Sequence, residues 1–169
     1  NPVAYRNYVA GDHGTHVAGL VLGGPRFVRQ ASAIVQRLEL TIMNLVERTT
    51  IGSQNGPVTT FTSRPAYISE AIAYAKRNNA TIVNISFATD SRLQTFEDSL
   101  RGSPNILAIV SAGNSKHRLE RIEEYPAAYG GTSGQLSHQL ITVAAHDADF
   151  ALIRESNWSP SLVDLAAPG

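Results

Sequence analysis

Three apolar runs that alternate with helical patterns constrain the fold more than any other feature of the sequence. They cover residues 82–87, which are expected to form a buried strand, and residues 106–110 and 140–145. The run at 106–110 is continuously apolar, which is typical of a strand covered on both faces. Strands alternating with helices predict an α/β fold with a mainly parallel sheet and helices on both sides. Sites in such sheets lie beyond the carboxyl ends of the strands.

Two helices are predicted between these runs. The first opens at Pro65, carries apolar residues at helical spacing from Ile68 to Ala75, and closes at residues 76–79. The second is expected to be capped by Asp90 and to end at Gly102. Its buried residues are expected to be Leu93, Phe96 and Leu100.

The first third of the chain gives weaker signals. Residues 1–12 read as a loop, and residues 38–43 alternate in part and carry β-formers, which predicts a strand. Residues 46–63 are rich in Thr, Gly, Ser and Asn and are interpreted as an exposed connection. We find no internal repeat.

Composition limits the classes of function. A chain of 169 residues with 43% hydrophobic content is enough for one domain with a core, and we expect a single domain over residues 1–169. Fourteen basic and fourteen acidic residues give no net charge, so neither nucleic acid nor a membrane is expected as a partner. The absence of cysteine excludes disulfides and thiol catalysis.

Residues 13–19, His-Gly-Thr-His-Val-Ala-Gly, predict a helix that begins at a functional surface. His13 and His16 share one face, while Val17, Leu20 and Val21 form an apolar stripe expected to enter a core. The positive end of the helix disfavours an imidazolium, which suits His13 as a neutral proton acceptor. The glycines in the helix suggest close approach of another backbone or a substrate. A surface helix with two incidental histidines is the alternative. A zinc site is another, but the helix lacks the Glu of the metalloprotease motif.

This string resembles the catalytic-histidine signature of the subtilisin-like serine proteases, the subtilases. The resemblance implies a three-layer α/β/α fold of the subtilisin type and assigns the role of catalytic base to His13. Many relatives insert an Asn-rich calcium loop into the helix after the histidine, and this chain lacks it. No metal site is therefore predicted from this chain, although a structural calcium is compatible with the intact protein.

Residues 111–114 follow the run at 106–110 and resemble the Ala-Gly-Asn motif of subtilases. In that family the Asn side chain donates a hydrogen bond to the oxyanion, and the resemblance gives this role to Asn114. Ser111, Ala112 and Gly113 are then expected to bind substrate. An ordinary turn is the alternative, because Gly-Asn favours turns anywhere.

Residues 84–88 resemble the family segment Asn-x-Ser-Leu-Gly, which pairs with the substrate as an added strand. Ser86, Phe87 and Ala88 are therefore expected to line the cleft. The family usually has glycine where Ala88 stands, and the extra methyl group would narrow the pocket for the residue before the scissile bond.

Residues 125–127, Tyr-Pro-Ala, also resemble a family segment. In relatives the preceding residue lies near the floor of the primary specificity pocket, and here it is Glu124. A carboxylate there predicts a preference for Arg or Lys before the scissile bond. The alternative is that Glu123 and Glu124 belong to a charged surface loop.

Residues 163–169 resemble the segment that leads toward the nucleophile helix of subtilases. The Gly-Thr-Ser motif that the family places downstream of this segment is not found. Ser133 ends a similar Gly-Thr-Ser string, but that string lies before the run at 140–145, on the opposite side from the family motif. The family's Asp turn ahead of the histidine is also not found. Asp12 is interpreted as a loop residue, and Asp164 as a structural one that holds the turn before Pro168.

The resemblance therefore implies a partial subtilase peptidase domain, part of a serine endopeptidase, that carries His13 and Asn114 but is inactive alone. It implies a peptide or protein substrate, no cofactor for catalysis, a secreted or periplasmic location, and room for a pro-segment in the parent protein. The alternative is a pseudoprotease or peptide-binding module. A nucleotide-binding domain is disfavoured because no Gly-rich phosphate loop joins a strand to a helix.

Overall fold

The computed structural model describes residues 13–23, 39–43, 45–52, 56, 58–64 and 67–169. The chain forms two compact units, Asn1–Ser63 and Arg64–Gly169. The predicted loop over residues 1–12, with Asp12, lies outside the described residues, as does Pro65.

The first unit contains the predicted motif helix, α1, which spans His13–Val21. The helix ends where Gly23 adopts a positive φ of 78° and donates a backbone hydrogen bond of 2.9 Å to Leu20. The expected burial of its apolar stripe is wrong for this structure, since Leu20 is 68% exposed. The described residues of this unit include no buried side chain that could form a core against it.

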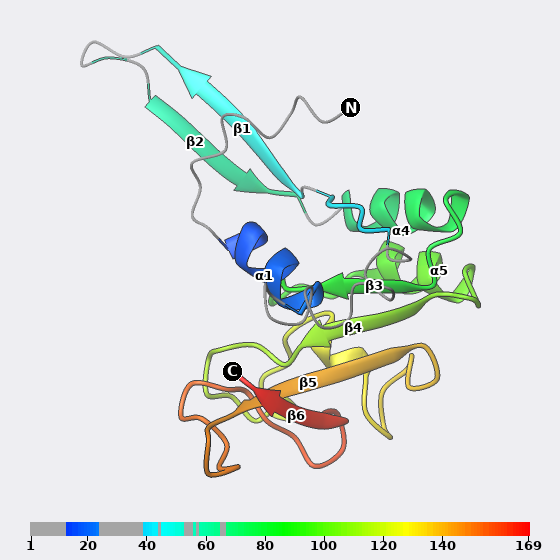
Figure 1. Ribbon diagram of the computed structural model, residues 1–169, viewed down its shortest axis with the longest axis vertical. Coiled ribbons are helices and arrows are strands. Elements are labelled where there is room, and N and C mark those ends of the chain that lie inside the picture. The colour runs from blue at the N-terminus through cyan, green and yellow to red at the C-terminus, as the bar shows by residue number, and fades with distance from the viewer. Residues whose placement is uncertain (1–12, 24–38, 44, 53–55, 57, 65–66) are drawn as a thin grey trace. The chain divides into compact units, whose positions relative to one another are not determined.

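A β-hairpin completes the described part of the first unit. Strand β1, Val46–Ile51, pairs antiparallel with β2, Val58–Ser63, in a register that joins Val46 to Ser63 (Figure 1). The exposed connection expected at 46–63 thus contains a hairpin of two strands, because its Thr residues favour strands even without a clear apolar alternation. The predicted strand at 38–43 is wrong, because residues 39–43 have no regular structure.

The second unit is built on a parallel sheet, as predicted. It contains β3 (Ile82–Ile85), β4 (Leu107–Ser111), β5 (Leu140–His146) and β6 (Leu165–Pro168), hydrogen-bonded in the order β3-β4-β5-β6 (Figure 1). All three pairings are parallel, so the four carboxyl ends meet at one edge. Strand β6 was not predicted.

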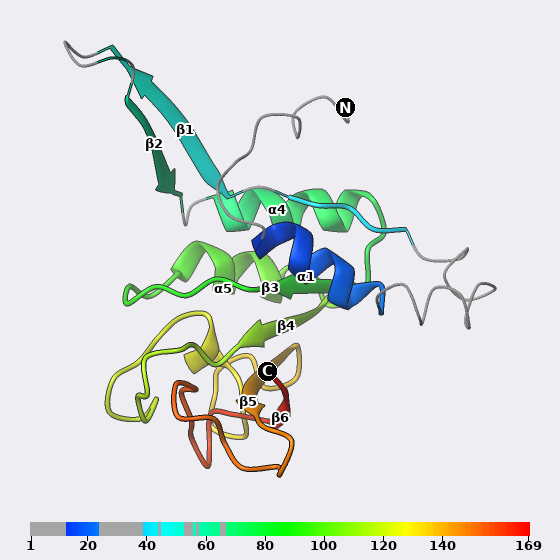
Figure 2. The same ribbon diagram turned by 60° about the vertical axis from the view of Figure 1, so that its left-hand side comes forward.

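Two helices pack side by side near β3 in both views (Figures 1 and 2). Helix α4 spans Tyr67–Arg77 and buries Ile68 and Ile72, and α5 spans Gln94–Arg101 and buries Phe96 and Leu100, as the periodicity predicts. None of the described helices has the length and apolar character needed to cross a membrane. The sheet with its helices is consistent with an incomplete three-layer α/β/α arrangement.

Two local expectations about this unit are wrong. Asp90 does not cap α5; the N-cap is Leu93, whose backbone N–H donates 2.9 Å to the Tyr129 hydroxyl. Strand β3 is also buried on one side only, since Val83 and Ile85 are covered while Ile82 is 64% exposed. Strand β3 is the outermost member of its sheet, and one face lacks a covering layer among the described residues.

A buried carboxylate ties α5 to the loop before it. Glu97 is 5% exposed and accepts hydrogen bonds from Arg92 at 2.9 Å and Arg101 at 3.1 Å. Burial alone would raise the pKa of Glu97, but the two guanidinium groups outweigh it and hold the pKa below its ordinary value. The charged form of Glu97 therefore stabilises the folded protein.

Candidate active site

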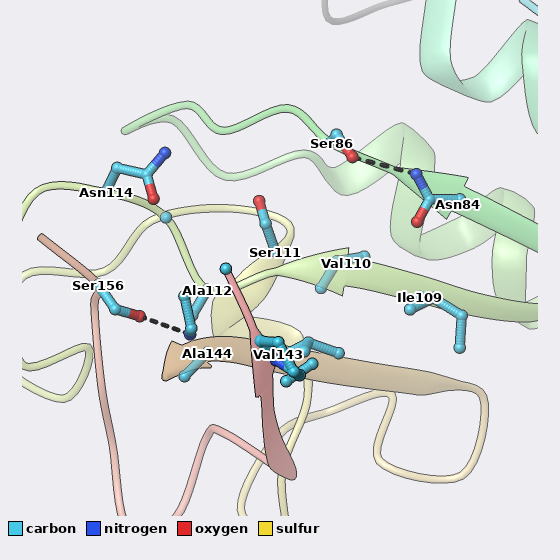
Figure 3. A pocket seen from close by; sticks show the side chains of 15 residues that line it. Asn84, Ser86, Ile109, Val110, Ser111, Ala112, Asn114, Val143, Ala144 and Ser156 are labelled. Atoms are coloured by element: carbon cyan, nitrogen blue, oxygen red, sulfur yellow. Dashed lines mark hydrogen bonds between the residues drawn. The ribbon is translucent and has the colours of Figure 1, made fainter. Parts of the chain in front are cut away.

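A pocket of about 340 Å³ opens at the carboxyl ends of the parallel strands (Figure 3). Its wall combines backbone and small side chains from all four strands with a few polar groups. Because parallel strands end at the same edge, residues far apart in sequence converge there. The lining residues are Asn84, Ser86, residues 109–114, residues 143–145, Ser156 and residues 167–169.

Four of the predicted substrate-binding residues, Ser86, Ser111, Ala112 and Gly113, line this pocket, as does Asn114, the predicted oxyanion donor. Ser86 follows β3 and accepts a hydrogen bond of 3.0 Å from the Asn84 amide (Figure 3). Asn114 follows β4 and is exposed, so its carboxamide is open to a ligand at this edge. The arrangement brings a side-chain N–H donor next to the segment after β3.

Phe87, Ala88 and Glu124 do not line the pocket. The chain nevertheless holds their two segments together, because Thr89 and Tyr125 exchange backbone hydrogen bonds of 2.9 and 2.8 Å. Ala88 comes directly before Thr89 and Glu124 directly before Tyr125, so both residues are next to this hydrogen-bonded pair.

The Glu124 carboxylate lies against the backbone of Gly113. A Cβ atom on Gly113 would come within 2.4 Å of Glu124 Oε2, and the Glu124 side chain is only 12% exposed. On its other side, Oε1 lies 3.1 Å from His117 Nδ1. Glu124 is thus a largely covered carboxylate beside the Asn114 loop, in contrast to the exposed Glu123.

Gly113 adopts a conformation that side chains rarely take. Its φ is +102°, and an added Cβ would meet Asn157 Nδ2 and Glu124 Oε2, each at 2.4 Å. The turn that presents Asn114 therefore needs glycine both for its dihedral angle and for the space.

Ser156 and Asn157 contribute to this site and were not predicted. Ser156 lines the pocket and accepts a hydrogen bond of 3.0 Å from the Ala145 backbone (Figure 3). Asn157 lies directly behind the Asn114 loop and is fully buried. Both belong to a long irregular segment between β5 and β6, whose polar sequence carries no periodicity that marks them as buried.

Two other polar residues lie outside the pocket. The Asp164 carboxylate accepts backbone hydrogen bonds from Gly131 at 3.0 Å and Thr142 at 2.7 Å, so it joins the 131–139 loop to β5. This role is structural, as expected, although it fixes a different segment from the turn before Pro168. Ser133 lies in the loop that leads into β5 and donates its backbone N–H to Ser161 at 3.0 Å.

His13 is the first residue of α1 in the first unit, and its side chain is exposed. An added Cβ on either Gly14 or Gly19 would meet nothing within 4 Å, so no described backbone makes the close approach expected there. Within the described ranges no group of three His, Asp or Glu residues is arranged to hold a metal ion.

The model of the subtilase family (Peptidase_S8) matches residues 4–169. The chain belongs to the subtilase family. The fold prediction and the resemblance drawn from the His13 string are therefore confirmed.

Individual subtilases are similar at modest identity. The subtilisin-like protease 3 of Plasmodium falciparum is 25% identical over 93% of this chain and 21% of its own length. The thermostable alkaline protease of Halalkalibacterium halodurans is 26% identical over 93% of this chain and 37% of its own. The crystal structure of a lanthipeptide protease shares the fold, with a TM-score of 0.51 and 17% identity over 69% of this chain and 35% of its own. The chain thus spans between 21% and 37% of the length of these relatives.

Proposed function

We propose that the protein carrying this chain is a serine endopeptidase in which His13 is the general base and Asn114 is an oxyanion donor. A serine hydroxyl attacks the peptide carbonyl, and His13 accepts its proton and later donates it to the leaving amine. The carbonyl oxygen gains negative charge in this step, and an N–H donor aimed at it lowers the barrier. The observation that carries the proposal is the exposed Asn114 at the carboxyl end of β4, in a chain that matches subtilases throughout.

The segment after β3 is proposed to bind the substrate backbone. Ser86 is exposed at the pocket and belongs to a segment that is hydrogen-bonded to Tyr125 through Thr89. An extended peptide added there would have its backbone held by residues 86–88 and its carbonyl near Asn114. This arrangement supports recognition of extended peptides or of exposed loops in protein substrates.

Glu124 is proposed to select a basic side chain before the scissile bond. Its carboxylate is 12% exposed and adjoins Gly113, one residue from the proposed oxyanion donor. A carboxylate in a partly dry position favours a cation over an apolar side chain. The nearby His117 imidazole then competes with the substrate for the same carboxylate.

The nucleophile and the acid that orients the histidine are proposed to come from other parts of the protein. Ser133 is held outside the pocket by its loop, and Asp164 is engaged by Gly131 and Thr142. The 169-residue polypeptide by itself is therefore expected to be inactive. A pseudoprotease that binds peptides without cleaving them is the second candidate, favoured by these same observations.

The test is hydrolysis of fluorogenic peptides by the full-length protein and by the 169-residue polypeptide. Activity is expected only in the former, and His13→Ala is expected to abolish it. His138→Ala, an exposed histidine in the loop before β5, is the matched control and should retain activity. Binding of peptides by the full-length protein without cleavage would support the pseudoprotease.

Asn114→Ala provides the second arm. It is expected to lower kcat by about 100- to 1,000-fold with little change in KM, a range that comes from a member of this same family. Asn78→Ala, at the exposed end of α4, is its control. An unchanged kcat in Asn114→Ala would contradict the assigned role.

We propose a secreted or periplasmic location on the strength of the family resemblance, with peptides or proteins as the partners. Fractionation of cells that express the full-length gene tests the location. A structural calcium in the intact protein would raise the unfolding temperature of the purified protein, compared with the same protein in a chelator.

A further inference from the structure

Asn157 is fully buried and makes hydrogen bonds to the loop on both sides of Asn114. Its Oδ1 accepts from the backbone N–H groups of Ser115 at 2.9 Å and His117 at 2.8 Å. Its Nδ2 donates to the Ala112 carbonyl at 2.9 Å. The Asn157 backbone N–H donates to the Gly113 carbonyl, also at 2.9 Å.

The partner types fix the orientation of the Asn157 amide. Two N–H donors face one atom and a carbonyl faces the other, so only one assignment of oxygen and nitrogen satisfies them. Oδ1 accepts two hydrogen bonds, and Asn157 has no exposed surface. A buried amide satisfied in this way resists movement, because leaving any of these groups unpaired is costly.

These bonds lie on both sides of Asn114, which is exposed. Residues 112 and 113 precede Asn114 and residues 115 and 117 follow it, and each is bound by Asn157, while the Asn114 side chain points to the pocket edge (Figure 3). Space reinforces the bonds, since Asn157 Nδ2 occupies the position 2.4 Å from where a Gly113 Cβ would stand. The loop cannot move away from Asn157 without breaking these hydrogen bonds.

We propose that Asn157 is the positioning residue that holds Asn114 in the geometry needed to donate to the oxyanion. This inference rests on the proposed function of Asn114. An oxyanion donor acts only if it is already placed where charge develops, and displacement by about 1 Å can cost on the order of 100-fold in rate. Asn157 touches neither the substrate nor the reacting atoms in this account and acts through the 112–117 loop.

The test is a double-mutant cycle on peptide hydrolysis by the full-length protein. Asn157→Ala is expected to lower kcat by about 100-fold with KM unchanged when Asn114 is present. In the Asn114→Ala background the same change is expected to have almost no further effect, because the donor that it misplaces is already gone. Asn157→Asp keeps the two acceptor bonds but loses the donor to Ala112, so it is expected to lower kcat less and serves if Asn157→Ala does not fold.

Gln139→Ala is the matched control for lost stability. Gln139 is another buried amide, 5% exposed, whose Nε2 donates to the Leu100 and Ser103 carbonyls at 3.1 and 3.0 Å, away from the pocket. It is expected to lower the unfolding temperature and to leave kcat unchanged. A general loss of packing would instead lower kcat in both variants.

Equal losses of kcat from the Asn157 change in both backgrounds would overturn the inference and leave the role of Asn114 intact. A rise in KM alone would overturn it as well. No effect of Asn114→Ala on its own would overturn the proposed function, and the inference with it, so the two failures are distinguishable.

Discussion

Gly113→Ala is expected to destabilise the second unit more than an ordinary substitution in a turn. The φ of +102° costs an L-residue about 1 to 3 kcal/mol. The new Cβ would also stand 2.4 Å from both Asn157 Nδ2 and Glu124 Oε2, and relief of such crowding in a packed region costs about 1 to 3 kcal/mol. The two effects together predict a loss of about 2 to 6 kcal/mol in the free energy of unfolding.

Gly56→Ala separates the two effects. Gly56 has the same φ of +102°, but a Cβ there would meet no atom of the described residues within 4 Å. Urea unfolding followed by far-ultraviolet circular dichroism gives the free energy for both variants. The loss in the free energy of unfolding should be larger for Gly113→Ala than for Gly56→Ala by the cost of crowding alone, about 1 to 3 kcal/mol. Combining Gly113→Ala with Glu124→Ala should reduce this difference. Equal losses at the two glycines would refute the reasoning, because the contacts around Gly113 would then carry no cost.

Substitutions at three carboxylates of the second unit test other parts of the structure. Glu97→Gln should cost about 1 to 3 kcal/mol at pH 7. The pKa of Glu97 is depressed in the folded protein, so its contribution to stability is present above its ordinary value of 4.5 and is lost as the pH falls through the lower, folded pKa. The urea midpoints of the parent and the variant should therefore converge as the pH is lowered below 4.5. Asp164→Ala leaves two backbone N–H groups without their acceptor and should cost about 2 to 4 kcal/mol in thermal unfolding, with Asp164→Asn costing less. Glu124→Gln should lower kcat/KM for cleavage after Lys by about tenfold relative to cleavage after Phe; an unchanged ratio would remove Glu124 from substrate selection.

Periodicity in the sequence was sufficient for most of the second unit. The spacing of Ile68, Ile72, Phe96 and Leu100 identified the buried faces of α4 and α5, and the apolar runs identified β3, β4 and β5. The resemblance to subtilases predicted that residues 111–114 belong to the site, and they line a pocket at the carboxyl ends of the parallel strands.

The sequence was a poor guide where long-range contacts decide the structure. The hairpin of β1 and β2 is stabilised by pairing across the turn rather than by a regular apolar pattern, so its Thr-rich strands resembled a loop. Asn157 lies 40 to 45 residues from its side-chain partners, and nothing in its local sequence marks it as buried. The Glu124 carboxylate lies beside Gly113 through contacts between separate loops, which no local pattern in the sequence shows.

A structure of the full-length protein bound to a peptide aldehyde tests the central claim most directly. The aldehyde carbon forms a tetrahedral adduct with a catalytic serine, and its oxygen marks the position of the oxyanion. The account predicts that this oxygen accepts a hydrogen bond from Asn114 Nδ2 and that the imidazole of His13 contacts the serine oxygen. An adduct whose oxygen is bound by other donors, or a serine whose oxygen contacts a different base, would contradict it.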